Sequence, residues 1–262
     1  MASIFLLVIS VLIFGAYKMY EKMTSDTVAP VIKCGSEEIL VSVSASEEEF
    51  LSDVTAIDDE SGDVSETLVV EEISAFAEEN TRIITYAAID EKGNVGRHNR
   101  ILKYTDYQIP KFNLTNSLRF PKGRMVNVLE NMEVYSVLDG DLTDSIKYSV
   151  ENTINLDNTG VYSIEFRVMD STGHIEYLNT EIEIYDITEE RIQVSLSEYL
   201  IYLPKGAQFN PQAYYVGADT EGTLAIQSNV NTSEAGVYSV DYVVQGVSSI
   251  GKNRLIVVVT ES

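Results

Sequence analysis

The stretch DNTGVYSIEFRVMD, residues Asp157–Asp170, has a second copy downstream, SEAGVYSVDYVVQG, residues Ser233–Gly246. After the shared Gly-Val-Tyr-Ser, apolar and polar side chains alternate, with Ile164, Phe166 and Val168 in the apolar series of the first copy. Side chains of a β-strand point alternately to opposite faces of a sheet, so a period of two is typical of a strand with one buried face. Both copies therefore predict a strand that borders a hydrophobic core.

Similarity at a nearly fixed spacing extends beyond this stretch. LRFPKGRMVN (Leu118–Asn127) matches IYLPKGAQFN (Ile201–Asn210), and a more diverged upstream copy includes RIITYAAIDEKGN (Arg82–Asn94). Short alternating strands separated by turns that contain Asp, Asn and Gly are typical of β-sandwiches. The sequence therefore predicts an all-β protein of tandem immunoglobulin-like sandwiches. The three predicted domains are residues 26–108, which are diverged, residues 109–186, and residues 187–262, which are also diverged.

The repeated glycine and tyrosine predict a structural corner. In immunoglobulin-type sandwiches a tyrosine hydroxyl bonds back to the backbone and fixes the chain where it crosses between the sheets. Glycine is expected there because it supplies a positive φ without strain. The predicted corner residues are Gly160, Tyr162, Gly236 and Tyr238. Two residues beyond each tyrosine, where antibody domains have a cysteine, Ile164 and Val240 predict an aliphatic contact in place of a disulfide.

The first repeat departs from this corner pattern. Asn80 and Arg82 stand at its glycine and tyrosine positions. Its final hairpin is nevertheless clear, because YAAIDEKGN (Tyr86–Asn94) joins an alternating strand to a glycine-bearing turn. We therefore expect a sandwich in the first repeat, and the sequence leaves its corner open.

The N-terminal segment SIFLLVISVLIFGAYKMY, Ser3–Tyr20, contains a single charged residue, Lys18. About 20 apolar residues form about 30 Å of helix, which reaches across the hydrocarbon core of a bilayer. The alternative, a signal peptide, would need a basic start and a small-residue cleavage site. We predict a single-pass transmembrane helix that contacts the membrane through residues 3–20, within an anchor and stalk at residues 1–25. Long domains translocate largely regardless of flanking charge, so the lysines beside the helix do not decide the orientation. We expect the rest of the chain outside the cell because of the type of its domains.

Charge and cysteine content narrow the class of protein. Hydrophobic residues make up 45% of the 262 residues, which supports packed cores and argues against a disordered chain. The formal net charge of −23 repels nucleic-acid phosphates, so we expect no nucleic-acid partner. Cys34 is the sole cysteine, so no internal disulfide forms, although domains of this size hold together outside the cell by packing alone.

Several stretches together resemble one family. They are DTVAPVI (Asp26–Ile32), AIDDESGDVS (Ala56–Ser65), YAAIDEKGN (Tyr86–Asn94), VLDGDLTDSI (Val137–Ile146) and GVYSIEFRVMDSTGH (Gly160–His174). They are similar to bacterial immunoglobulin-like domains, and more narrowly to the family named from the repeats of a pesticidal crystal protein. The third repeat departs most, because Gly246 stands at the position of the family's aspartate. The resemblance implies β-sandwich modules at bacterial cell surfaces that act as spacers or adhesive elements, and it implies no single ligand.

The sequence contains no arrangement that favours catalysis. The two histidines, His98 and His174, fall in different repeats, so a Ser-His-Asp set would need chance geometry. Histidine and cysteine ligands are too few for a zinc site. No glycine-rich phosphate loop follows a strand and opens a helix. We therefore predict that the protein is not an enzyme.

The densest set of carboxylates is the candidate metal site. Its members are Asp58, Asp59, Asp63 and Asp90, and their counterparts in the second repeat are Asp139, Asp141, Asp144 and Asp170. Calcium takes six to eight oxygen ligands, but the set lacks the spaced ladder of an EF-hand. Asp, Asn and Gly are also ordinary turn formers. We therefore predict turn chemistry with no metal and no cofactor, and keep calcium as the alternative.

The predicted function is that of a membrane-anchored bacterial surface protein whose domains act as an extracellular spacer or scaffold. The alternative is an adhesive module that grips a glycan or a protein through the distal domain, residues 187–262. Aromatic side chains there form a candidate platform for sugars, although the same residues also suit sandwich packing. They are Tyr199, Tyr202, Tyr214 and Tyr215. The sequence does not identify the partner.

Overall fold

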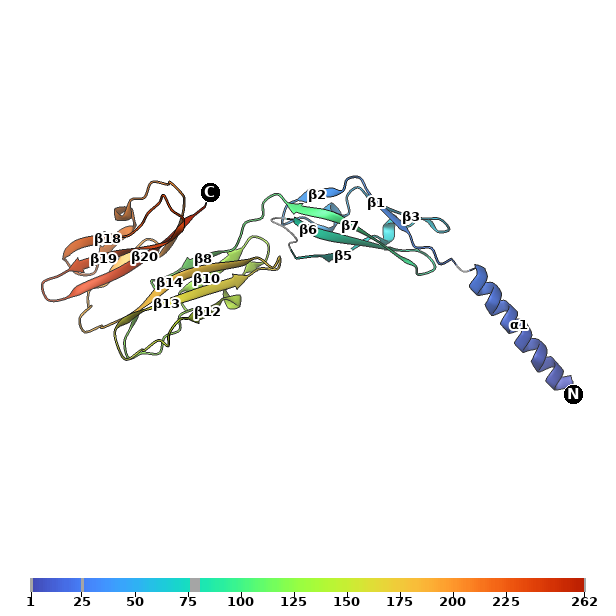
Figure 1. Ribbon diagram of the computed structural model, residues 1–262, viewed down its shortest axis with the longest axis horizontal. Helices are drawn as coiled ribbons and strands as arrows, with labels where there is room; N and C mark the ends of the chain where they lie inside the picture. Colours follow the sequence, from blue (N-terminus) through green and yellow to red (C-terminus); the bar gives the residue numbers. More distant parts are fainter. Residues whose placement is uncertain (1, 25, 76–80, 262) are drawn as a thin grey trace. The chain divides into compact units, whose positions relative to one another are not determined.

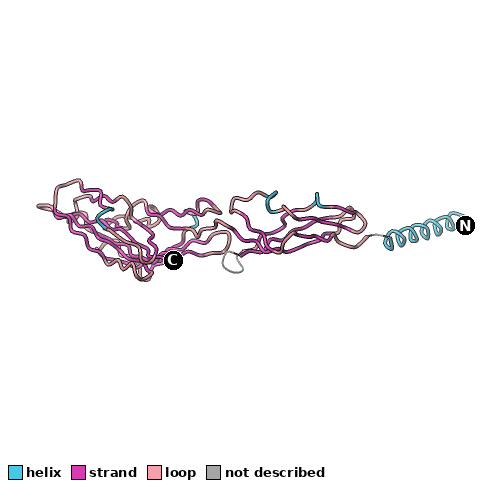
Figure 2. The backbone as a smooth tube through the Cα atoms, turned by 90° about the horizontal axis from the view of Figure 1, so that it is seen from above, coloured by secondary structure: helices cyan, strands magenta, loops and turns pink. Residues whose placement is uncertain are grey.

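The computed structural model describes residues 2–24, 26–75 and 81–261, and within the N-terminal helix the side chains of residues 5–20. These residues form two compact units, Met1–Tyr107 (unit 1) and Gln108–Ser262 (unit 2). Figure 1 labels the elements along the chain, and Figure 2 shows that strands and loops make up nearly all of it outside the N-terminal helix. The all-β prediction is therefore confirmed.

Helix α1 spans Ala2–Thr24. Among the residues that the structure describes, no helix is both long enough and apolar enough to cross a membrane. A span requires about 20 consecutive apolar residues, and the prediction that residues 3–20 form a transmembrane helix is therefore not supported. Residues 1 and 25 of the predicted anchor and stalk lie outside the described residues.

Unit 1 contains two sheets, with strand orders β1-β3-β4 and β2-β7-β6-β5. The strands are β1 (Val31–Cys34), β2 (Glu38–Val41), β3 (Val54–Asp58), β4 (Gly62–Asp63), β5 (Val69–Ile73), β6 (Thr81–Ile89) and β7 (Val95–Tyr104). Neighbouring strands are antiparallel, except that β2 runs parallel to β7. The short helices α2 (Glu47–Phe50) and η1 (Ser65–Thr67) lie in the connections.

The core of unit 1 follows the alternation of its strands. Strand β3 buries every second residue, namely Val54, Ala56 and Asp58. Strand β6 contributes Tyr86, which is fully buried, and its hydroxyl donates a hydrogen bond to the backbone oxygen of Phe50 at 2.9 Å. Because Asp58 is in phase with the apolar residues of β3, the strand period turns its carboxyl group inward at the end of the core.

Unit 2 repeats this arrangement twice. Its first sandwich has sheets β11-β10-β8 and β12-β13-β14-β9, and its second has sheets β15-β17 and β16-β20-β19-β18. The strands of the first are β8 (Lys111–Leu114), β9 (Arg119–Pro121), β10 (Met132–Ser136), β11 (Gly140–Asp141), β12 (Lys147–Val150), β13 (Gly160–Met169) and β14 (Ile175–Tyr185). Those of the second are β15 (Val194–Leu196), β16 (Leu200–Pro204), β17 (Tyr215–Ala218), β18 (Thr223–Ser228), β19 (Gly236–Gln245) and β20 (Ile250–Thr260). Each sandwich also has one short 3₁₀ helix, η2 (Thr143–Ser145) or η3 (Pro211–Tyr214).

The two sandwiches of unit 2 have cores that touch. Ile164 lies in the first core and Val240 in the second, with exposed fractions of 3% and 0%. Leu200 and Ile256, from strands of the second sandwich, belong to the hydrophobic cluster of the first. The strand sets of the protein fall within the ranges 26–108, 109–186 and 187–262, but the last two ranges form one compact unit. The division into three separate domains stays a prediction.

Both tyrosines of the predicted corner bond back to the backbone. The hydroxyl of Tyr162 donates to the backbone oxygen of Asn155 at 3.2 Å, and that of Tyr238 donates to the backbone oxygen of Glu234 at 3.0 Å. The expectation that the preceding glycines supply a positive φ is wrong, because neither lies in the left-handed region. A Cβ at Gly160 would stand 3.3 Å from the Tyr162 ring, and one at Gly236 3.5 Å from the Tyr238 ring. The tyrosine ring thus leaves little room for a side chain at Gly160, whereas a Cβ at Gly236 would make an ordinary van der Waals contact.

In the first repeat, an arginine occupies the position of the corner tyrosine. Arg82 is buried, and its guanidinium donates to the backbone oxygens of Ile73 and Ser74 and to the hydroxyl of Tyr104. Asn80, the other departure noted in the sequence, lies outside the described residues.

Candidate functional site

Three buried aspartates meet at one end of the unit 1 sandwich. Asp26, Asp58 and Asp90 each contribute a carboxylate oxygen, and these oxygens lie within 4.8 Å of one another. Their exposed fractions are 8%, 3% and 6%. The residues come from the segment before β1, the end of β3 and the turn after β6, so the fold brings together groups that are far apart in the sequence.

Backbone amides orient each carboxyl group through one oxygen. Oδ1 of Asp58 accepts hydrogen bonds from the N–H groups two and three residues further along the chain, at 3.0 and 2.7 Å. Oδ1 of Asp90 accepts them from the N–H groups two and four residues further along, at 2.8 and 2.9 Å. Oδ1 of Asp26 accepts one from the N–H group two residues further along, at 2.8 Å. Each aspartate is thus fixed by its own turn.

The second oxygens differ in their surroundings. Oδ2 of Asp58 is buried and has no hydrogen-bond partner among the described residues. Oδ2 of Asp90 accepts from the side-chain amide of Asn94 at 2.7 Å, and the same amide donates to the backbone oxygen of Asp26 at 3.3 Å. Burial would raise the pKa of Asp90, but the hydrogen bonds from Asn94 and the nearby backbone hold the pKa below its usual value. Asp90 is therefore ionised at neutral pH.

The described ion pairs of unit 1 lie away from this cluster. They are Arg97–Glu71, Arg100–Asp53 and Lys103–Glu38. Among the described residues no lysine or arginine side chain forms an ion pair with Asp58 or Asp90. The carboxylate of Asp58 is thus buried beside that of Asp90 with no neutralising side chain of its own.

The sequence identified two of the three members of this cluster. Of the four candidates, Asp58 and Asp90 lie in it, whereas Asp59 and Asp63 are exposed. Oδ1 of Asp63 accepts from a backbone N–H two residues ahead at 3.0 Å, which is the turn chemistry expected for it. Asp26 was missed, and its signal was its place at the start of DTVAPVI, the stretch that leads into the first strand.

The corresponding end of the next sandwich is built differently. Ser136 pairs with Gly140 as Asp58 pairs with Gly62, so the serine occupies the position of the aspartate. Its hydroxyl lies 3.4 Å from a carboxylate oxygen of Asp139 and accepts from two backbone N–H groups at 3.2 and 3.1 Å. Unit 2, over its described residues, has no group of three acidic side chains like that of unit 1.

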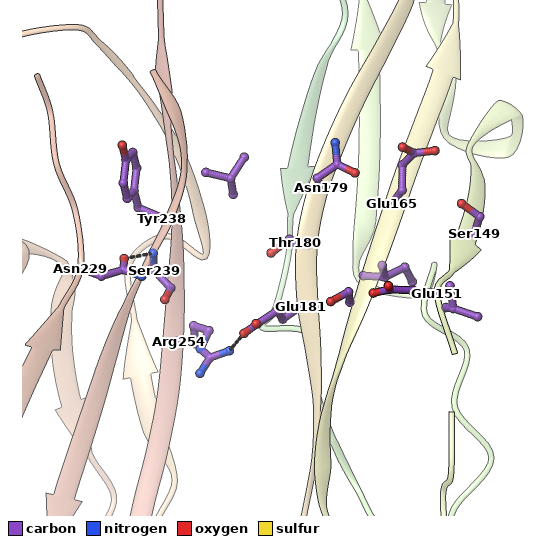
Figure 3. A pocket seen from close by; sticks show the side chains of 14 residues that line it. Ser149, Glu151, Glu165, Asn179, Thr180, Glu181, Asn229, Tyr238, Ser239 and Arg254 are labelled. Atoms are coloured by element: carbon purple, nitrogen blue, oxygen red, sulfur yellow. Dashed lines mark hydrogen bonds and ion pairs between the residues drawn. The ribbon is translucent and has the colours of Figure 1, made fainter. Parts of the chain in front are cut away.

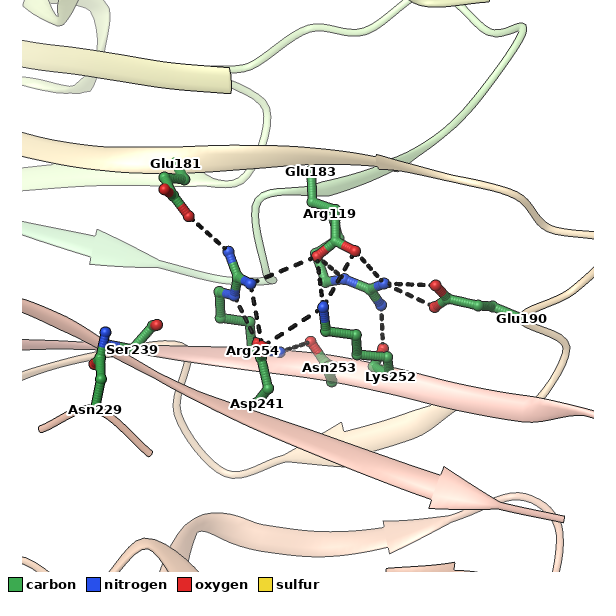
Figure 4. A network of polar contacts seen from close by, with 10 residues as sticks. All are labelled: Arg119, Glu181, Glu183, Glu190, Asn229, Ser239, Asp241, Lys252, Asn253 and Arg254. Atoms are coloured by element: carbon green, nitrogen blue, oxygen red, sulfur yellow. Dashed lines mark hydrogen bonds and ion pairs between the residues drawn. The ribbon is translucent and has the colours of Figure 1, made fainter. Parts of the chain in front are cut away.

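A second polar centre joins the two sandwiches of unit 2, and Figure 4 shows its members. Arg119 of β9 donates to both oxygens of Glu183 on the neighbouring strand β14, at 3.0 and 3.2 Å. It also donates to both oxygens of Glu190, in the connection to the second sandwich, at 3.0 and 2.7 Å. Lys252 of β20 reaches Glu183 from the other side, at 3.2 Å to each oxygen.

A second arginine extends this network. Arg254 of β20 donates to both oxygens of Asp241 on β19, at 2.7 and 3.2 Å, and to Glu181 of the first sandwich at 3.3 Å. Burial would raise the pKa of Glu183, but Arg119 and Lys252 hold the pKa below its usual value. The network, in which cations and carboxylates alternate, therefore remains charged at neutral pH.

Apolar packing accompanies the charges at this junction. Leu200 and Ile256 extend the core of the first sandwich. The hydroxyl of Tyr202 accepts a hydrogen bond from the backbone N–H of Phe112 at 3.1 Å, and the Nζ of Lys111 lies 5.3 Å from the centre of the tyrosine ring. The sandwiches are thus joined by hydrophobic contacts, a hydrogen bond and a charged network.

Beside the network lies a cleft of about 540 Å³, shown in Figure 3. Strands of both sandwiches line it with hydroxyl, amide and carboxylate groups. These include Ser149, Glu165, Asn179, Thr180, Ser239 and Arg254. The cleft offers many hydrogen-bonding groups and one aromatic ring, that of Tyr238.

The tyrosines proposed as a sugar platform are partly buried and pack against the sandwich cores. Tyr215 stacks on Tyr242 with ring centres 6.4 Å apart, and Tyr214 lies beside Phe209 at 5.9 Å. The histidines are far from one another in the chain, His98 being exposed on β7 and His174 lying in a turn near Glu176. The aromatic side chains thus contribute to packing.

No family model matches the chain. An uncharacterized 81.3 kDa protein of Acholeplasma phage L2 is 25% identical over 159 residues, which is 55% of this chain and 20% of that protein, so the chain spans about a fifth of this relative. A solved structure of Clostridium perfringens ZmpB contains the M60 catalytic domain with CBM51-1 and CBM51-2. The match covers 90% of this chain and 31% of the ZmpB chain, with 12% sequence identity and a TM-score of 0.22. Human CDH23 EC21-23 matches 88% of this chain and 100% of its own at 12% identity and a TM-score of 0.22. At these TM-scores the likeness carries no argument about function.

Proposed function

We propose that the protein is a non-catalytic spacer or scaffold built from immunoglobulin-like sandwiches, related to bacterial immunoglobulin-like repeats and working outside the cell. Such a role requires neighbouring sandwiches to hold a fixed geometry. The observation that carries the proposal is the junction in unit 2, where Arg119 bridges Glu183 of one sandwich and Glu190 of the connection, and Lys252 of the other sandwich completes the contact. The acidic surface fits a protein that stays soluble in a crowded exterior.

The burial of this junction supports stiffness. The side chain of Arg119 is 5% exposed and those of Glu183 and Glu190 are 14% and 15% exposed. Separating the sandwiches would leave buried charges without partners, which is strongly unfavourable. Leu200 and Ile256 would also lose their place in the first core. The two sandwiches therefore act as one body, as a spacer requires.

A distance measurement within the full chain tests this proposal. Spin labels are attached at Tyr148→Cys on β12 and Val216→Cys on β17, two exposed positions, in a Cys34→Ser background. Pulsed electron double resonance should give one narrow distance distribution between them. Arg119→Ala with Lys252→Ala should broaden it, whereas Lys205→Ala, which breaks an exposed ion pair inside the second sandwich, should not. A broad distribution in the unmodified junction would overturn the proposal.

The cleft in Figure 3 favours a second candidate function, an adhesive module that grips a glycan. Sugars are bound by convergent hydroxyl, amide and carboxylate groups, which line this cleft. A glycan array with the full chain tests this. Binding that is lost in Asn179→Ala and retained in Asn113→Ala, a change on β8 outside the cleft, would support it; an array with no bound glycan would count against it.

A further inference from the structure

The aspartate cluster of unit 1 contains a buried carboxylate oxygen, Oδ2 of Asp58, that has no hydrogen-bond partner among the described residues. Three carboxyl groups converge with oxygens within 4.8 Å of one another, in surroundings that are more than nine-tenths buried. Like charges at this separation repel one another strongly when water is excluded. Asp58 is the most buried of the three and shares the buried face of β3 with Val54 and Ala56, and its buried Oδ2 has no hydrogen-bond donor among the described residues. A buried carboxylate oxygen of this kind is costly unless a cation or a donor meets it.

We propose that Asp26, Asp58 and Asp90 bind one calcium ion. Their Oδ1 atoms are held by backbone N–H groups, so the carboxyl groups are oriented before the ion arrives. The side-chain amide of Asn94 ties Asp90 to the backbone of Asp26, which holds two of the three segments together. The turns thus fix the carboxyl groups through Oδ1, and at Asp58 they leave Oδ2 available to the ion.

The donor set and its size favour calcium over other divalent cations. All three side chains offer oxygen, whereas zinc prefers nitrogen and sulfur. Calcium–oxygen distances are about 2.3–2.6 Å, so ligands on opposite sides of the ion lie about 4.6–5.2 Å apart. The carboxylate oxygens lie within 4.8 Å of one another, so an ion of this size fits between them. Magnesium keeps several water ligands and is usually bound through one or two carboxylates, so three converging carboxyl groups suit calcium better.

The segment that begins with Asp26 lies close to the backbone of β7. A Cβ at Gly96 on β7 would stand 1.9 Å from the backbone oxygen of Pro30, so only glycine lets the segment before β1 lie this close to the strand. An ion bound here would therefore fasten the start of the sandwich to the turns after β3 and β6.

Calorimetric titration of the chelator-treated full chain with calcium chloride tests the proposal, with magnesium chloride as the comparison. We expect one calcium site per chain with a dissociation constant on the order of 0.1 mM, as in extracellular modules. At 10 mM calcium the melting temperature of unit 1 should rise by roughly 10 °C. The absence of calcium binding up to 10 mM, or equal binding of magnesium, would overturn the assignment.

Matched variants locate the ion. Asp58→Asn keeps the shape and the Oδ1 acceptor but removes the charge, and should abolish both the calorimetric signal and the melting shift. Asp26→Asn should weaken calcium binding at least tenfold. Because Asp26 lies outside the strands, this variant replaces Asp58→Asn as the test if Asp58→Asn does not fold. Asp170→Asn, at the corresponding turn of the next sandwich, and the double change Asp59→Asn with Asp63→Asn should bind calcium normally. Binding that survives Asp58→Asn, or that disappears in either control, would place the ion elsewhere and refute this site.

Discussion

The first sandwich of unit 2 and the sandwich of unit 1 share a strand topology. They differ in the residues at two equivalent positions, one on the parallel strand pair and one at a turn. On the parallel strand pair, unit 1 has Leu40 opposite Lys103, whereas the corresponding pair in unit 2 is Arg119 opposite Glu183. Leu40 is 62% exposed, and Lys103 forms an exposed ion pair, while Arg119 and Glu183 are covered by the next sandwich. The same backbone therefore serves as a free surface in one unit and as a junction in the other.

The second difference is at the turns. Where unit 1 has the buried Asp58, unit 2 has Ser136, whose hydroxyl is satisfied by neighbouring groups. The Ser136 hydroxyl thus has hydrogen-bond partners within its own turn, whereas Oδ2 of Asp58 has none among the described residues. The sandwich topology therefore sets where polar groups converge. The single residue at each position then decides whether the buried group is neutral, is charged or is covered by a neighbouring sandwich.

The largest test of the comparison is Arg119→Met. Removing the arginine takes from the partly buried Glu190 its ion-pair partner among the described residues and leaves Glu183 with Lys252 and the more distant Arg254, so unit 2 should lose about 3–5 kcal/mol of unfolding free energy. Hydrogen exchange of peptides from β13 and β14, measured as a function of urea, reports that free energy for unit 2 alone.

The matched control is Lys103→Met in unit 1, which breaks the exposed pair with Glu38. It should change the exchange of β6 and β7 by about 0–1 kcal/mol. Equal losses in the two variants would show that the junction has no special energetic role and would break the comparison.

The next test is acidification. The pKa of Glu183 is lower in the folded chain than its ordinary value, since Arg119 and Lys252 outweigh its burial. A depressed folded pKa contributes stability above the unfolded value of about 4.5, and that stability is lost as the pH falls through the folded pKa. The exchange-derived stability of unit 2 should therefore fall steeply below about pH 4.5.

In Arg119→Met this dependence on pH should be shallower, because the main cause of the depressed pKa is gone. Hydrogen exchange corrected for intrinsic rates at pH 6, 5, 4 and 3 gives both curves. Parallel curves in the two proteins would mean that Glu183 does not control the acid response.

A smaller effect is expected from Ser136→Asp, which places the missing carboxylate of unit 1 into unit 2. The new charge would be buried close to the carboxylate of Asp139, and the described residues of unit 2 hold no group of three acidic side chains that could bind an ion, so unit 2 should lose about 1–3 kcal/mol. Ser136→Asn, of the same shape but neutral, should cost less. Urea-dependent exchange of β10 measures both, and an unchanged stability in Ser136→Asp would mean that this end tolerates charge without an ion.

The sequence predicts the sandwiches better than it predicts these differences. Alternation over residues such as Ile164 and Phe166 identifies a buried face, because strand period is a local property. The cluster of Asp26 with Asp58 and Asp90 depends on strands that pair over long separations, so composition alone grouped Asp58 with the exposed Asp59 and Asp63 instead. Local turn chemistry and a converging site use the same residue type, and only the fold separates them.

The junction shows the same limit more strongly. Arg119 falls in LRFPKGRMVN, whose match to IYLPKGAQFN indicated a repeat but gave no sign that the arginine is buried. Its partners Glu183, Glu190 and Lys252 are ordinary surface residue types in sequence. Their burial comes from the docking of one sandwich on another, which no pattern within a single repeat encodes.

The smallest predicted effect concerns the corners. Tyr162→Phe removes one hydroxyl that bonds to the backbone oxygen of Asn155 at a partly exposed position, so unit 2 should lose about 0.5–1.5 kcal/mol. Tyr148→Phe, an exposed tyrosine of β12 whose ring packs near Phe166, is the matched control and should lose less. Exchange of β13 measures both. In unit 1, Arg82 stands at the position of Tyr162, and its guanidinium donates hydrogen bonds to three oxygens. The corner is therefore held by an arginine in unit 1 and by a tyrosine hydroxyl in unit 2. Equal losses in Tyr162→Phe and its control would mean that glycine and ring packing, rather than the hydroxyl, hold the corner in unit 2.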